Sequence, residues 1–242
     1  KTAYEIYQCD WSSDVCSSDL DVDRGRLAAA LAERRLEVHY QPKVRFDGGG
    51  VCGVEALARW NDPVLGSIAP DQFVPLAERE GLAEALTRYV LETALHAAAA
   101  WRRAGYDLSV AVNLSSQILD DANWVRIIPS LARQHGIPAD RVVLEITESS
   151  LARHQSKALA NLAQLRLLGF GLSIDDYGTG YSSLQQLARL PFSELKIDRS
   201  FILGAAGRPR QQAILTSALD LARRLSLVSV AEGVENPMDW DL

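Results

Sequence analysis

The chain has 242 residues, of which 48% are hydrophobic and 23% charged, and its formal net charge is -6. This composition indicates a globular domain, and no apolar run approaches the roughly 18 residues that a membrane helix needs. The mild acidity argues against a nucleic-acid polymer as partner, and the three cysteines make no disulfide framework. Because no secretory signal is visible, we expect a cytoplasmic location, unless segments outside this chain anchor a longer protein to a membrane.

The first twenty residues read unlike the rest of the chain. They place Cys9 and Cys16 around a Ser/Asp cluster without apolar periodicity. Codons for WSSDVCSSDL spell the text of a common short-read sequencing adapter, and codons for KTAYEI match the upstream part of the same primer. We therefore expect residues 1–20 to be translated adapter without a structural role, followed by one domain over residues 21–242.

From there on, strand-like runs alternate with helical runs. β-branched and aromatic residues predict strands at 36–42, 51–60, 108–115, 141–149, 170–180, 194–202 and 227–235. Helical composition and capping residues predict helices at 70–80, 84–105, up to about 135, and at 151–169, 182–190 and 210–226. Near-continuous apolar strands that alternate with helices predict a mainly parallel sheet, close to a (β/α)8 barrel.

Polar residues stand where the apolar runs of these strands stop. They are Glu55, Asn113, Glu145, Glu148, Asp175, Asp176, Lys196, Asp198, Glu232 and Glu235. In a barrel the carboxyl ends of the strands converge on the face that carries the active site. A single acid at such a position is more often a helix cap or loop residue, but so many converging carboxylates repel one another unless a cation neutralises them.

This set of oxygen ligands predicts a site for hard divalent cations such as Mg²⁺ or Mn²⁺. The adjacent pair Asp175 and Asp176 suits two metals, as in two-metal phosphoryl displacement. Lys196, on the next strand, has two interpretations. It positions a nucleophilic water or a phosphate, or it forms a salt bridge to Asp175 or Asp176 that holds the site when metal is absent.

The motifs YQPKV, VEALARW, VAVNLSS, LEITES, IDDYGTGYSSL, LKIDRSFI and AEGVE follow one another in this order. Together they resemble the EAL domain family of cyclic-di-GMP phosphodiesterases, over about residues 21–242. The resemblance implies an α/β fold, a modified TIM (β/α)8-type barrel with an antiparallel first strand. It also implies that the family's last strand is missing from this chain, so we expect an open barrel that is unstable or inactive unless completed.

The resemblance also implies residue roles. A first metal would be bound by Glu55, Asn113, Glu145 and Asp175, and a second surrounded by Asp175, Asp176 and Glu232. Catalysis would involve Glu55, Lys196 beside the hydrolytic water, and Glu232, which is also a candidate general base. The dinucleotide would contact Gln41, Leu57, Arg59 and Glu235, where Arg59 can offer a bidentate fork to phosphate. Glu148 would support the loop that starts at residue 175.

The implied reaction is hydrolysis of cyclic-di-GMP to linear pGpG with two divalent cations, Mg²⁺ or Mn²⁺. The implied partners are a second copy of the chain, through DDYGTGYSS at 175–183, and an upstream sensor or diguanylate-cyclase domain. Two alternatives stay open. One is a catalytically inactive domain that only binds cyclic-di-GMP, although such members usually lose the Glu at position 55 or one of the paired aspartates. The other is an unrelated barrel enzyme that uses divalent metal on another phosphate ester.

Overall fold

The computed structural model describes residues 22–153, 157–178 and 191–241. The segment 1–20 and the predicted helix at 182–190 therefore lie outside the described residues, as does most of the predicted dimer segment 175–183. Within the described part, no helix is both long enough and apolar enough to cross a membrane.

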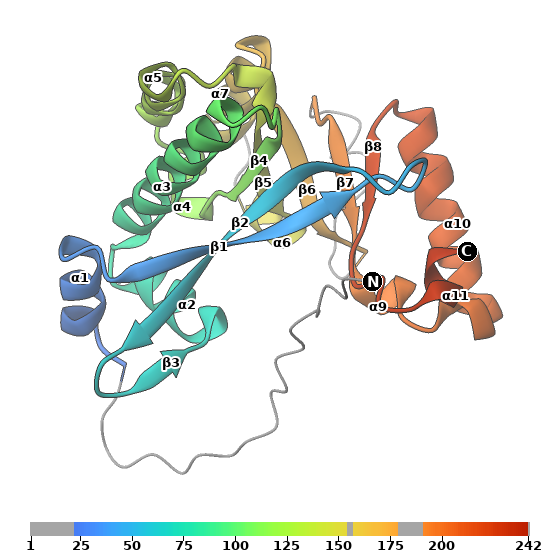
Figure 1. Cartoon of the computed structure of the whole chain (residues 1–242), viewed down its shortest axis with the longest axis horizontal. Helices are drawn as coiled ribbons and strands as arrows, with labels where there is room; N and C mark the ends of the chain where they lie inside the picture. The colour runs from blue at the N-terminus through green and yellow to red at the C-terminus, as the bar shows by residue number, and fades with distance from the viewer. Residues whose placement is uncertain (1–21, 154–156, 179–190, 242) are drawn as a thin grey trace.

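The described strands form one curved sheet (Figure 1). They are β1 (Leu36–Val44), β2 (Val51–Asp62), β3 (Gly66–Ile68), β4 (Ser109–Asn113), β5 (Val142–Thr147), β6 (Gly171–Tyr177), β7 (Glu194–Ile197) and β8 (Val228–Ala231). The order is β1-β2-β4-β5-β6-β7-β8, and β3 pairs with β2. β1 runs antiparallel to β2, and every later pair along this order is parallel, which confirms the expected antiparallel first strand.

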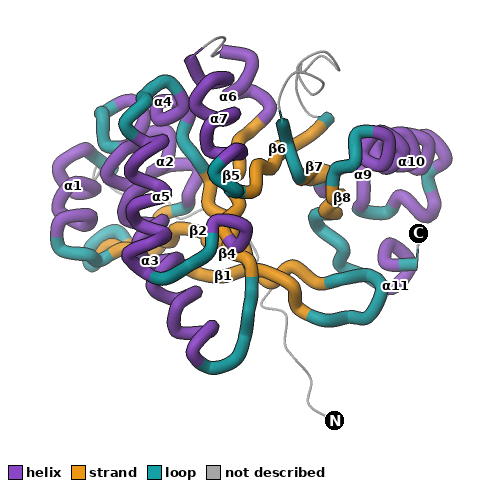
Figure 2. Tube along the Cα trace, turned by 90° about the horizontal axis from the view of Figure 1, so that it is seen from above, coloured by secondary structure: helices purple, strands orange, loops and turns teal. Residues whose placement is uncertain are grey.

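Helices follow the strands as a barrel of βα units requires. They are α1 (Arg24–Ala32), α2 (Pro70–Arg79), α3 (Ala83–Arg103), α4 (Ser116–Leu119), α5 (Trp124–His135), α6 (Glu148–Arg153), α7 (Lys157–Leu167), α9 (Arg199–Ile202), α10 (Pro209–Arg224) and α11 (Pro237–Trp240). Seen from above, α1–α7 lie on one side of the strands and α9–α11 on the other (Figure 2). The barrel is open, since β1 and β8 are the two ends of the described sheet.

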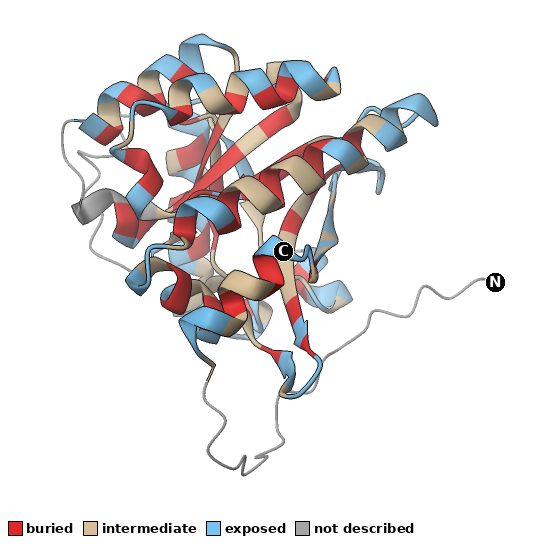
Figure 3. Cartoon of the chain, turned by 90° about the vertical axis from the view of Figure 1, so that its left-hand side faces the viewer, coloured by how far each residue is buried: buried red, intermediate tan, exposed pale blue. Residues whose placement is uncertain are grey.

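Buried residues are unevenly distributed along the sheet. Figure 3 shows them from the side of α1 and α3. One large core joins β1–β7 to α1–α5 and α7, reaches Ala222 of α10, and includes fully buried residues such as Leu91, Val112, Leu144 and Leu172. A second cluster has only four buried members, Ile197, Ile202, Leu215 and Ala218, and lies between β7, α9 and α10. The β8 flank of the sheet is therefore held by much less apolar burial than the β2–β6 part.

The seven predicted strands are all present, and the differences from prediction have local causes. β3 was not predicted; it forms because Asp62 Oδ1 accepts from the backbone N–H groups of Val64 and Leu65, which turns the chain back along β2. The helix predicted at 151–169 corresponds to α6 and α7, which lie on either side of residues 154–156.

Candidate metal centre

The ammonium group of Lys196 is the centre of a cluster of buried acids. Its Nζ lies 2.9 Å from Glu55 Oε2, 3.2 Å from Glu145 Oε2, 3.1 Å from Asp175 Oδ1 and 2.8 Å from Glu232 Oε1. Lys196 is only 2% exposed and Glu145 is fully buried. The predicted salt bridge between Lys196 and Asp175 is thus present, as part of a larger network.

Five strands, β2 and β5–β8, deliver these side chains to the interior of the sheet. Glu145 and Lys196 lie within β5 and β7, Asp175 lies near the end of β6, and Glu232 directly follows β8. Glu55 differs from the prediction, because β2 continues for seven residues beyond it to Asp62. It still reaches the cluster, since register with β4 places it opposite Ala111, two residues before the end of that strand.

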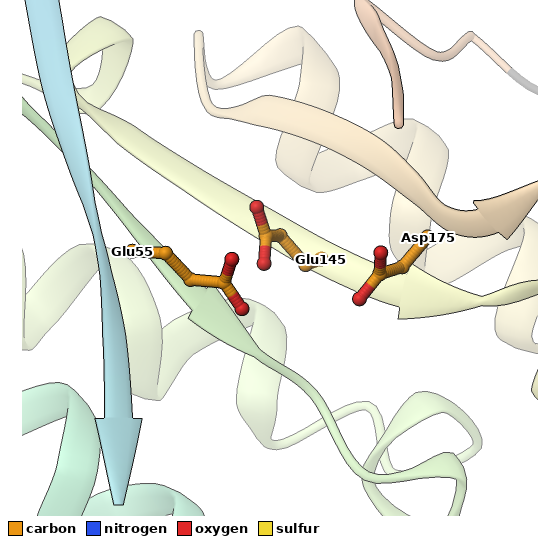
Figure 4. Close-up of side chains that lie close together, drawn as sticks. All are labelled: Glu55, Glu145 and Asp175. Atoms are coloured by element: carbon orange, nitrogen blue, oxygen red, sulfur yellow. The ribbon is translucent and has the colours of Figure 1, made fainter. Parts of the chain in front are cut away.

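The carboxylates form two overlapping groups in which one oxygen per residue lies within 4.8 Å of the others. The first acidic group is Glu55, Glu145 and Asp175, whose carboxylates converge in Figure 4. The second acidic group is Asp175, Asp176 and Glu232. An all-oxygen donor set of this kind fits hard divalent cations, so the described residues could hold two of them.

The electrostatics of the cluster favour an added cation. Burial and the charge of Glu55 raise the pKa of Glu145 to about 8, against the opposing effect of Lys196. Burial also raises the pKa of Asp176 and of Glu232. Three of the five acids are therefore reluctant to ionise together, which a divalent cation would relieve.

Lys196 offsets part of this repulsion. Burial alone would lower the pKa of Lys196, but the carboxylates around it, Glu145 first, raise it well above its ordinary value. Burial likewise pushes the pKa of Glu55 upward, but the Lys196 ammonium outweighs this and the net shift is downward. Lys196 is thus a fixed positive charge in the metal-free cluster.

Three further predicted residues border the cluster. Asn113 donates its amide to Glu55 Oε1 at 3.0 Å. Asp176 has a left-handed backbone with φ of 56°, at an irregularity in the β6–β7 register, a place where a bulge re-aims side chains. Glu148 Oε2 accepts from the N–H of Gly178 at 3.0 Å, so it holds the start of the segment that follows β6.

Three of the four residues predicted to contact the dinucleotide share one face of the β1–β2 pair. Gln41 pairs with Glu55, and Leu57 and Arg59 follow Glu55 at alternate positions of β2. Arg59 is half-buried and donates to Ala58 O at 2.9 Å, whereas Glu235 is exposed on the β8 side. Asp198 is a helix cap, because its carboxylate accepts from Ser200 N at the start of α9.

Sequence reasoning missed two ion pairs beside the centre, both formed by Lys43. Lys43 Nζ lies 2.9 Å from Glu145 Oε1 and 2.8 Å from Glu194 Oε1. Lys43 lies inside the motif YQPKV and Glu194 directly precedes LKIDRSFI, but Glu194 begins its strand and Lys43 lies in the antiparallel strand β1, so the rule of carboxyl ends on parallel strands selects neither. The available signal was a lysine at an inward position of a strand, two residues after Gln41.

Comparison with known proteins identifies the arrangement. The family model described as the EAL domain matches residues 24–242. The chain is 45% identical over 210 residues to the bifunctional diguanylate cyclase/cyclic di-GMP phosphodiesterase MucR of Pseudomonas aeruginosa, covering 86% of this chain and 31% of that protein. It is 37% identical over 216 residues to the cyclic di-GMP phosphodiesterase RocR of the same organism, covering 89% of this chain and 54% of RocR.

A solved structure agrees with these relatives. The PaMucR phosphodiesterase in complex with c-di-GMP superposes with a TM-score of 0.84 at 43% identity, covering 90% of this chain and 88% of that one. The chain spans only about a third of full-length MucR and about half of RocR.

Proposed function

The chain belongs to the EAL domain family, and on that premise we propose that it hydrolyses cyclic di-GMP to linear pGpG with two divalent cations, Mg²⁺ or Mn²⁺. The observation that carries the proposal is the pair of acidic groups around Lys196, in which four of the five carboxylates pair with one buried ammonium. The names of MucR and RocR, and the c-di-GMP complex of the former, support the choice of substrate.

Each acidic group has a proposed role. Bound cations would supply Lewis-acid polarisation of the phosphate and a nucleophilic water at neutral pH. The first cation would be held by Glu55, Glu145 and Asp175, together with the side-chain oxygen of Asn113 once that amide turns. The second would be held by Asp175, Asp176 and Glu232.

Lys196 and Glu232 also have proposed roles in positioning the attacking water and in proton transfer. Lys196 must leave the centre of the first acidic group when a cation enters, and it then donates to the attacking water or to the phosphate. Glu232 is the candidate general base, because burial raises its pKa toward the neutral range in which a base works best.

The substrate would lie over the inward face of β1 and β2. Gln41 and Leu57 flank Glu55 on that face. Arg59 would exchange its bond to Ala58 O for two parallel bonds to a phosphate, which a lysine could not make. Glu235 would contact the dinucleotide from the β8 side, and Glu148 would keep the segment after β6 in place.

Wider assembly is part of the same proposal. We expect a homodimer through residues 175–183 and, because the name of MucR includes a diguanylate cyclase and the chain spans 31% of it, an upstream signalling domain in the complete protein. A cytoplasmic location stays a prediction.

The decisive test is turnover of cyclic di-GMP with Mg²⁺ or Mn²⁺, by the 242-residue chain and by a longer chain that carries the family's last strand, followed by chromatographic detection of pGpG. From the longer chain we expect metal-dependent product that EDTA abolishes, and from the 242-residue chain little or none. Tight binding of cyclic di-GMP by calorimetry with no metal-dependent product would instead identify a binding module.

A further inference from the structure

Lys43 approaches the metal centre from β1, the strand that runs against the others. It pairs with Gly53, which presents no side chain, and the register of β1 and β2 slips between Lys43 and Val44. The side chain of Lys43 thus lies on the same inward face as those of Gln41 and Glu55, two positions after Gln41 along β1. A register slip at this position fixes where the lysine side chain points.

Lys43 forms two ion pairs. One is with Glu145, a candidate metal ligand, and the other is with Glu194, which belongs to neither acidic group. Its Nζ lies 2.9 Å from Glu145 Oε1 and 2.8 Å from Glu194 Oε1. The side chains of Lys43 and Glu194 are each 13% exposed, and that of Glu145 is fully buried. A carboxylate without access to water needs a partner on each oxygen, because an unpaired buried charge is costly.

The two oxygens of Glu145 have different partners. Oε2 accepts from Lys196, which also contacts Glu55 and Asp175 and so occupies the centre of the first acidic group. Oε1 accepts from Lys43, which among the described residues forms no ion pair with either of those two acids. A cation that enters the first acidic group therefore replaces Lys196 and leaves Lys43 in place.

No neighbouring side chain duplicates this contact in the described part of the chain. Ser173 stands between Glu145 and Glu194 in the sheet register, and it is fully buried. Its hydroxyl nevertheless has no hydrogen-bond partner there, so it does not donate to Glu145. The orientation of Glu145 depends on Lys43 from this side.

We propose that Lys43 is a positioning residue of the metal centre: by holding Glu145 Oε1, it presents Oε2 to the first cation. This rests on the proposed function, since it takes Glu145 as a ligand of that cation. Partners that orient a ligand in this way typically change metal affinity by about 10–100-fold when they are removed.

The test measures Mn²⁺ affinity of the metal-free 242-residue chain by calorimetry and by electron paramagnetic resonance. Lys43→Met removes the contact, Lys43→Arg keeps the charge, and Glu194→Gln is the matched control on the other partner of Lys43. We expect Lys43→Met to weaken the tighter Mn²⁺ site by about 10-fold or more. Lys43→Arg should recover most of the affinity, and Glu194→Gln should stay within about threefold of the parent chain.

Two outcomes would overturn the inference. Parent-like Mn²⁺ affinity in Lys43→Met would show that Glu145 is oriented without Lys43. An equal loss of Mn²⁺ affinity in Glu194→Gln would show that Lys43 only links β1 to β7. If Lys43→Met lacks a cooperative melt, Lys43→Gln replaces it, and a loss below about threefold counts against the inference. Failure of the proposed function has a different signature: the parent chain itself would bind no Mn²⁺, or the longer chain with the family's last strand would bind it without hydrolysing cyclic di-GMP.

Discussion

The two acidic groups share Asp175 but rest on unequal parts of the molecule. The residues of the first acidic group lie on β2, β5 and β6. Their sequence neighbours Val54, Leu144 and Ile174 are at most 6% exposed and belong to the large core. The second depends on Glu232, which is 27% exposed and follows β8, where Val228 is 64% exposed. Dense packing fixes side chains, so the first group is preformed and the second is the softer of the two.

Charge follows the same division. Glu145 in the first group is clamped by Lys43 and Lys196, one on each oxygen. The second group relies on Asp176, whose left-handed backbone costs on the order of 1–3 kcal/mol unless its surroundings enforce it. We infer that the first cation displaces Lys196 from carboxylates that are already in position, whereas the second must organise its own ligands.

The largest effect is expected from the first group. Glu55→Gln removes a charged ligand, and the loss of several kcal/mol of transition-state stabilisation corresponds to about 10³-fold or more in kcat. Turnover of cyclic di-GMP by the longer chain measures it, with Glu92→Gln on the surface of α3 as the control. Activity of Glu55→Gln within about tenfold of the parent would remove Glu55 from the metal site.

Lys196→Met should destabilise the metal-free chain by about 3–5 kcal/mol, because it leaves buried carboxylates without their shared partner. Urea unfolding with EDTA measures this, and Mn²⁺ should recover more stability in the variant than in the parent. Lys157→Met, at an exposed position of α7, is the control. Equal stability of the variant and the parent in EDTA would mean that Lys196 does not neutralise the cluster.

Gly233→Ala tests the softer group. Gly233 has φ of +70°, and an added Cβ would lie 2.6 Å from Arg199 Cβ, so we expect a cost of about 1–3 kcal/mol. Displacement of the neighbouring Glu232 should weaken the binding of the second cation and leave the binding of the first unchanged. Gly207→Ala, where an added Cβ meets nothing within 4 Å, is the control for thermal melts and Mn²⁺ titrations. Simultaneous loss of both cations would contradict the division.

A change of one pH unit should have the smallest effect. A carboxyl whose folded-state pKa is raised stabilises the fold fully below its unfolded pKa, and this stability is lost as pH rises through the folded pKa. For Glu145, whose pKa is raised from 4.5 to about 8, the metal-free chain should become less stable as pH rises from 4.5 to about 8. Urea unfolding in EDTA should show a slope of up to about 1 kcal/mol per pH unit, which saturating Mn²⁺ abolishes. A rise in stability over this range would contradict it.

Sequence reasoning predicts what is local and periodic here. The seven strands follow from apolar runs, and the gathering of Asn113, Asp175 and Glu232 follows from their places at or just after strand ends. Two features could not be predicted from the sequence: the position of Glu55 in mid-strand and the Lys43–Glu194 ion pair. Both depend on how β1 pairs with β2 and on how far apart β1 and β7 lie across the curved sheet. A strand-end rule also selects Asp198, which is a helix cap.

The most direct test of this difference between the two acidic groups compares Mn²⁺ titrations of the metal-free parent chain and of the metal-free Glu232→Gln variant. We expect two classes of site in the parent, separated by about tenfold or more in affinity, which corresponds to about 1.4 kcal/mol. Glu232→Gln should retain the tighter class and lose the weaker one. Loss of the tighter class in Glu232→Gln, or two sites of equal affinity in the parent, would show that the β8 flank is as well organised as the core.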